Sequence, residues 1–149
     1  MNGVRILAVC ASVAIVAGFA AVIMPEKEIA AAEIGIAAQE VIDECASARE
    51  KSLCYERVIP RYMDDHFTME QAFEITKEVQ RLDPSFTYCH VLAHNISAKE
   101  TAKDPSKWKD VVARASYGLC VNGGSHGAFQ ERFRDESMPN ASVDEILSI

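Results

Sequence analysis

The sequence predicts an all-α protein, with an N-terminal transmembrane helix followed by a small extracytoplasmic helical bundle. Residues 6–24 carry no charged side chain, and the only charge before residue 26 is that of Arg5. After Pro25 the apolar residues recur at spacings of three and four, the period of a helix that is buried on one face. No segment alternates apolar and polar residues as a half-buried strand does.

The apolar segment has the length of a membrane-spanning helix, which needs roughly 20 residues. Arg5 and the amino terminus precede it, so the positive-inside rule places the N-terminus in the cytoplasm and the C-terminal domain outside. We therefore expect a single-pass membrane protein. A cleaved signal peptide is the alternative interpretation, with Gly18-Phe19-Ala20 as the cleavage site. Both interpretations export the remainder of the chain.

The charge balance excludes one class of partner. The chain has 149 residues and a net charge of −7, whereas a protein that binds nucleic acid usually presents a basic face. We expect no nucleic-acid partner, and we expect the membrane and other membrane-protein subunits as the candidates. We divide the chain into an anchor or signal peptide at 1–25, an amphipathic helix and connector at 26–66, and a helical metal-site domain at 67–149.

The first helix after the anchor is expected over residues 29–58, ending before Pro60. Its apolar positions follow helical spacing from Ile34 to Ala48. The next helix begins at a capping box, in which Thr68 caps the helix and Gln71 reaches back to the cap.

Two Asp-Pro-Ser sequences predict the helices that follow. Asp83 and Asp104 each place a capping carboxylate before a proline that suits the first turn of a helix. The expected helices cover residues 86–102 and 106–119.

Glycines and a second capping box mark the last two helices. Gly123 and Gly124 interrupt the helical pattern, and a helix follows from there to about Phe133. The box from Ser142 to Glu145 predicts a short C-terminal helix that begins at Val143.

Four cysteines lie beyond the apolar segment, and an even number in an exported domain suggests two disulfides. The pair Cys89–Cys120 would tie neighbouring helices together. The pair Cys45–Cys54 needs a break in the expected helix 29–58, because nine residues of straight helix separate the two by roughly 13 Å. Four reduced, buried thiols are the alternative.

Three of the four histidines form a candidate metal site. His90 and His94 are four residues apart, so they share one face of a helix and can bind one ion. His126 lies among Gly123, Gly124 and Gly127, which allow the backbone to approach another helix closely. A Cys89–Cys120 bridge would bring the three histidines into one neighbourhood. This set suits a transition metal ion, with zinc or copper as the leading candidates.

Other residues near this set could complete the coordination of an ion. Gln130, Glu131 and His66 are the possible further ligands, and Gln130 shares a helix face with His126. The sequence lacks His-Glu-x-x-His, so the general base of a zinc protease is missing. The histidines could also be ordinary core or surface residues.

The site sequence resembles a family of exported microbial proteins of unknown function. The resemblance rests on Cys89-His90-Val91-Leu92-Ala93-His94 and on Cys120-Val121-Asn122-Gly123-Gly124-Ser125-His126-Gly127. Those proteins combine a C-H-x-x-x-H helix with a later C-x-x-G-x-x-H-G element, often followed by an acid where this chain has Gln130. The resemblance implies a metal or redox role and assigns no reaction.

Together these features predict a membrane-anchored extracytoplasmic helical protein that binds a transition metal through three histidines. They identify no catalytic residue, and whether the protein is an enzyme is left open. The competing hypothesis is an accessory or structural subunit of a membrane complex, which would use its transmembrane helix and the 29–58 helix for assembly.

Overall fold

The computed structural model describes residues 26–115 and 118–135, and the regular secondary structure within these ranges is entirely helical. The predicted transmembrane helix and the predicted helix at Val143 lie outside the described residues. Among the described helices, none combines the length and the apolar character that crossing a membrane requires. The elements in chain order are α1 (Glu26–Cys45), α2 (Lys51–Val58), η1 (Ile59–Arg61), α3 (Tyr62–Asp65), α4 (Met69–Leu82), α5 (His90–Lys103), η2 (Pro105–Lys107), α6 (Trp108–Arg114), η3 (Leu119–Asn122) and α7 (Gly123–Arg132).

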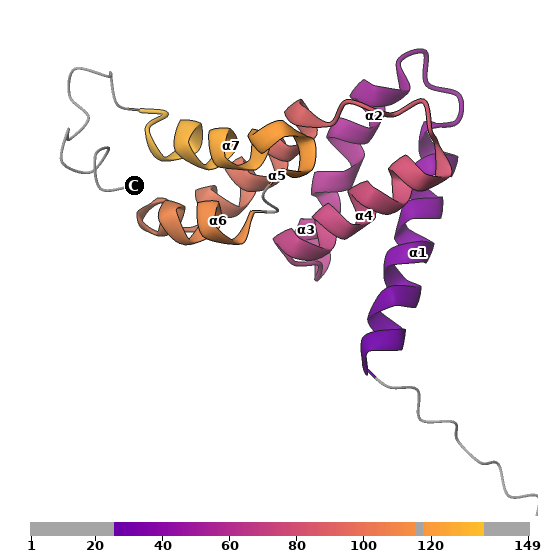
Figure 1. Cartoon of the computed structure of the whole chain (residues 1–149), viewed down its shortest axis with the longest axis horizontal. Coiled ribbons are helices and arrows are strands. Elements are labelled where there is room, and N and C mark those ends of the chain that lie inside the picture. Colours follow the sequence, from indigo (N-terminus) through magenta and orange to yellow (C-terminus); the bar gives the residue numbers. More distant parts are fainter. Residues whose placement is uncertain (1–25, 116–117, 136–149) are drawn as a thin grey trace, which may run out of the picture.

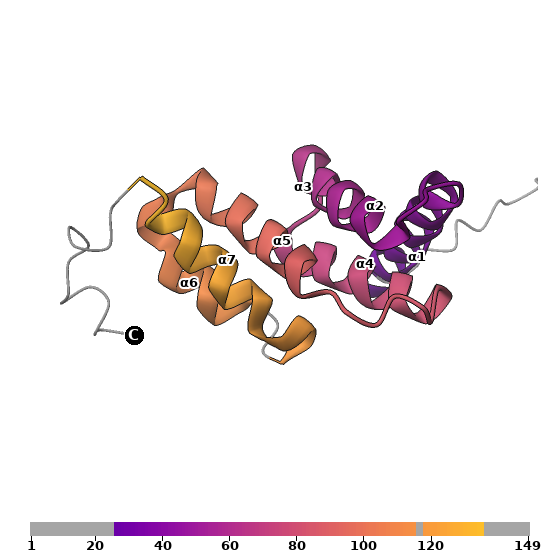
Figure 2. The same ribbon diagram turned by 90° about the horizontal axis from the view of Figure 1, so that it is seen from above.

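The helices form two groups that meet at α5. Figure 1 shows α1 to α4 on one side of the described structure and α6 and α7 on the other, and Figure 2 shows α5 and α7 side by side. One continuous apolar core runs from α1 into α7, including Val41, Phe73, Leu92 and Ala128. A second, smaller cluster joins Trp108 of α6 to Phe129 of α7 and to Phe133, the residue that follows α7.

The expectation of one helix over residues 29–58 is wrong. The helix ends at Cys45, the chain turns through residues 46–50, and α2 begins at Lys51. This reversal brings the Cα atoms of Cys45 and Cys54 within 5.8 Å, with their sulfur atoms bonded at 2.03 Å. The disulfide and the two turn hydrogen bonds from the amides of Ala46 and Ala48 stabilise the break, for which the sequence carries neither proline nor glycine.

The predicted helix end before Pro60 is confirmed, because α2 ends at Val58. Pro60 lies at the start of the 3₁₀ turn η1, where its missing N–H is tolerated because the first helical amides have no partner within the helix. The short helix α3 follows and ends at Asp65, with His66 as the capping residue after it.

The capping box at Thr68 is confirmed. The Thr68 hydroxyl accepts from the Gln71 amide at 3.2 Å, and the Thr68 amide donates to the Gln71 side chain at 2.8 Å. The helix that begins here, α4, buries Phe73, Ile75 and Val79.

The helix expected over 86–102 begins four residues later, at His90. Asp83 does not cap it. The Asp83 carboxylate instead accepts from Ser85 in a local turn and from the Tyr55 hydroxyl at 2.7 Å. Residues 86–89 are consequently not helical, which buries Phe86 against Tyr55 and places Cys89 just before the helix.

The helix expected over 106–119 is shorter than predicted. Asp104 accepts from the Ser106 amide at 3.1 Å, as its position before Pro105 predicts. The turn η2 leads into α6, which ends at Arg114 rather than at 119, because Ala115 takes an extended backbone conformation with ψ 131°. The last described helix, α7, ends close to the expected boundary near Phe133.

Candidate metal centre

His90, His94 and His126 converge on one point of the groove between α5 and α7. Each of the three offers a ring nitrogen, and these nitrogens lie within 4.8 Å of one another. The ring centroids are 5.1 Å apart for His90 and His94, 5.2 Å for His90 and His126, and 5.5 Å for His94 and His126. Three histidines at this separation could hold a metal ion, as the sequence predicts.

This group is singular within the part of the chain that the structure describes. No other set of three or more His, Cys, Asp or Glu side chains among residues 26–115 and 118–135 converges in this way. The set does not include the candidate ligands Glu131 and His66. Glu131 forms an ion pair with Arg134, and His66 is exposed at the end of α3 beside Phe67.

Two glycines set the register between α5 and α7. A Cβ atom on Gly123 would lie 2.3 Å from the His90 carbonyl oxygen, and one on Gly127 would lie 2.2 Å from that of His94. Because real Cβ atoms do not come this close to backbone atoms, only glycine fits at either position. The glycines are four residues apart, like the two histidines that they contact. The sequence-based expectation of a close backbone approach at these glycines is confirmed.

A left-handed turn leads into α7. Cys120, Val121 and Asn122 have φ angles of 54°, 53° and 61°, a region that is costly for residues other than glycine and especially for a β-branched one. The Cys89–Cys120 disulfide, with an S–S distance of 1.98 Å, ties this turn to the residue before His90. The disulfide therefore stabilises a strained backbone next to the site.

The same turn orients the His90 ring. Nδ1 of His90 lies 3.1 Å from the carbonyl oxygens of both Cys120 and Val121. Carbonyl oxygens only accept hydrogen bonds, so Nδ1 carries the proton and Nε2 keeps its lone pair. A metal-binding histidine commonly donates its second ring N–H to a backbone carbonyl in this way.

The surroundings of His94 favour its neutral form. Burial lowers the pKa of His94, and the neighbouring His90 and His126 lower it further, while a side-chain hydrogen bond with Gln130 acts in the opposite direction. A neutral imidazole is the form that binds a metal. Gln130 therefore contacts His94, one of the three candidate metal ligands. It lies on the helix face of His126, where the sequence predicted it.

Tyr88 and a pocket beside the site were not anticipated from the sequence. The Tyr88 ring stacks on His90 at a centroid distance of 6.0 Å and leaves 61% of its surface exposed. A pocket of about 450 Å³ adjoins His94 and is lined on the α7 side by Gln130 and Arg134.

Comparison with family models, with curated proteins and with solved structures finds no match for the chain. The function must therefore be argued from the site itself.

Proposed function

We propose that the protein binds one transition metal ion through His90, His94 and His126, in an extracytoplasmic domain anchored to the membrane. The observation that carries this proposal is the convergence of the three ring nitrogens within 4.8 Å. The tautomer of His90 supports it, because a ring with Nδ1–H bonded to backbone carbonyls has Nε2 available for a metal.

The donor set favours zinc or copper. Imidazole suits both ions, and three histidines with an open fourth position form a recurrent arrangement for a catalytic zinc. The four cysteines of the described domain are bonded in pairs, so they contribute no thiolate. A metal bound here would polarise a coordinated water or substrate oxygen when one occupies the fourth position.

The placement outside the cytoplasm rests on two independent features. Disulfides persist in oxidising compartments, and both cysteine pairs of the described domain lie at bonding distance. The charge-free residues 6–24, with Arg5 before them, supply an anchor in the orientation that exports the bundle.

The test is metal analysis of the full chain, purified in detergent without chelators and then titrated with zinc after metal removal. We expect one ion per chain. We expect His94→Ala to lower the zinc affinity by roughly 100-fold or more, because it leaves only two of the three histidine ligands. His66→Ala is the matched control, because this histidine lies outside the group, and it should leave the affinity unchanged. A wild-type chain that binds no zinc, or a His66→Ala effect as large as that of His94→Ala, contradicts the proposal.

A second candidate function, an accessory subunit of a membrane complex, is favoured by the surface of α1. Ile36 is 60% exposed and borders a groove of about 290 Å³ between α1 and α3, beside Tyr62 and Phe67. A partner helix would cover such a surface. Capture of partner subunits from solubilised membranes tests this candidate, and Ile36→Glu should abolish capture while the metal content stays unchanged.

A further inference from the structure

The groove that holds the three histidines continues beyond them into the pocket of about 450 Å³. The helices α5 and α7 run side by side, as Figure 2 shows. On each helix, side chains four residues apart share one face, so the two helices present facing side chains to the groove in successive layers. The first layer contains His90 and His126, and the next contains His94 and Gln130. The pocket follows at the level of Ala98.

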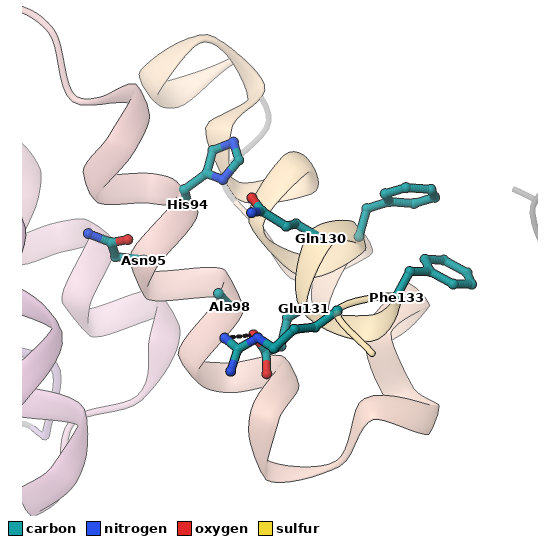
Figure 3. A pocket seen from close by; sticks show the side chains of 8 residues that line it. His94, Asn95, Ala98, Gln130, Glu131 and Phe133 are labelled. Carbon is teal, nitrogen blue, oxygen red and sulfur yellow. Dashed lines mark ion pairs between the residues drawn. The ribbon is translucent and has the colours of Figure 1, made fainter. Parts of the chain in front are cut away.

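Small and polar side chains leave this end of the groove open. Ala98 occupies little space on α5, and in Figure 3 the side chains of His94 and Gln130 face each other across the gap. The Phe133 ring points away from that gap in the same view. Five of the eight residues that line the pocket carry hydrogen-bonding side chains, namely His94, Asn95, Gln130, Glu131 and Arg134, so polar contacts can hold a ligand there.

The accessible charge at the far end of the pocket is positive. Arg134 and Glu131 form an ion pair, but the Glu131 side chain is only 9% exposed whereas that of Arg134 is 66% exposed. A guanidinium has five N–H donors in a planar fork, and one carboxylate partner leaves several of them free for a second. A ligand in the pocket thus meets hydrogen-bond donors at the Arg134 end.

We infer that the pocket binds a small polar dicarboxylate, with one carboxylate on the metal ion and the other on Arg134. This inference rests on the proposed metal site. Once the metal is bound, its end of the pocket is cationic, because the three histidines are neutral ligands. At the other end the exposed Arg134 guanidinium covers the carboxylate of its partner Glu131, so a ligand meets the cation of that pair. Gln130 lies between the two ends, where its amide can hydrogen-bond to the ligand.

The experiment uses the full chain loaded with cobalt(II), whose visible absorption reports a change of ligand. Cobalt affinity is measured first, and absence of binding would overturn the metal site itself. The cobalt protein is then titrated with azide, valerate and glutarate. Valerate and glutarate have chains of equal length and differ by the second carboxylate. We expect glutarate to bind about fivefold more tightly than valerate, as an exposed ion pair allows.

Two variants and one control separate the pocket from the metal. Arg134→Met should make glutarate and valerate equal, whereas Arg61→Met removes the same charge at a distant pair with Glu44 and should keep the preference. Ala98→Leu fills the pocket and should weaken both acids while cobalt affinity and azide binding stay unchanged. Equal binding of the two acids by the wild type, or unaltered binding of both by Ala98→Leu, would overturn the inference even though cobalt binds.

Discussion

The two ends of the bundle are built by different kinds of contact. In the α1–α4 half, large side chains such as Val41, Phe73 and Ile75 fill the space between helices. In the α5–α7 pair, glycine lets one helix backbone lie directly on the other, at Gly123 and Gly127. Side-chain packing can relax after a substitution, whereas two backbones in contact cannot. The half that carries the histidines is therefore the half whose geometry tolerates the least change.

The two disulfides provide the sharpest comparison of the two ends. They close sequence separations of 9 and 31 residues, for which loop entropy predicts contributions to stability of about 2.6 and 3.7 kcal/mol. Replacing both cysteines of either pair by serine should lower the free energy of unfolding by roughly those amounts, measured by denaturant titration.

Removal of one disulfide or the other should differ far more in its effect on metal affinity than in its effect on stability. Only the Cys89–Cys120 pair fixes the turn whose carbonyls orient His90, so only its removal should weaken zinc binding, by about tenfold or more. Equal zinc affinities of the two double variants would show that the turn does not position the ligand.

Alanine substitution at two helical glycines contrasts the halves directly. Gly127→Ala should lower the free energy of unfolding by about 3 kcal/mol and abolish zinc binding, because the added Cβ meets the His94 backbone at 2.2 Å. Gly35→Ala is the matched control in α1, where nothing lies within 4 Å of the added atom. It should raise stability by about 0.5–1 kcal/mol, since alanine is the better helix former. Thermal unfolding of both variants provides the comparison, and a tolerated Gly127→Ala would refute the backbone contact.

The strained turn predicts a substitution that stabilises the site half. Val121 has a φ of 53° and is 68% exposed, so replacing it removes strain and little packing. Val121→Gly should raise the free energy of unfolding by about 1 kcal/mol without changing zinc affinity. A destabilised variant would show that the Val121 side chain stabilises the protein by more than its left-handed backbone costs.

The smallest expected effect is a pH dependence of the metal-free protein. The pKa of His94 is lower in the folded chain than the ordinary value near 6.5, so below that pH the unfolded chain binds more protons. Stability should therefore be lost as pH falls through about 6.5 and towards the folded pKa. His94→Gln should remove this part of the dependence, as measured by denaturant titration between pH 5 and 8. An unchanged profile in the variant would assign the proton uptake to other groups.

The sequence predicted more of the site than of the element boundaries. The spacing of His90 and His94 is a local property of a helix, and the glycines near His126 indicated a close approach. The break after Cys45 was missed because a tertiary disulfide stabilises it, and no turn residue marks it. The late start of α5 was missed because Asp83 binds Tyr55, a residue 28 positions earlier in the chain. The left-handed turn at Val121 contradicts local preference, so no local signal could predict it.

X-ray absorption spectroscopy of the zinc-loaded full chain tests the three-histidine site itself, because it counts the imidazoles bound to the ion. We expect three imidazole rings with zinc–nitrogen distances of about 2.0 Å and one further light-atom ligand. His126→Ala should reduce the count to two. A spectrum with sulfur at about 2.3 Å, or with one imidazole or none, would contradict the assignment of His90, His94 and His126 as the metal ligands.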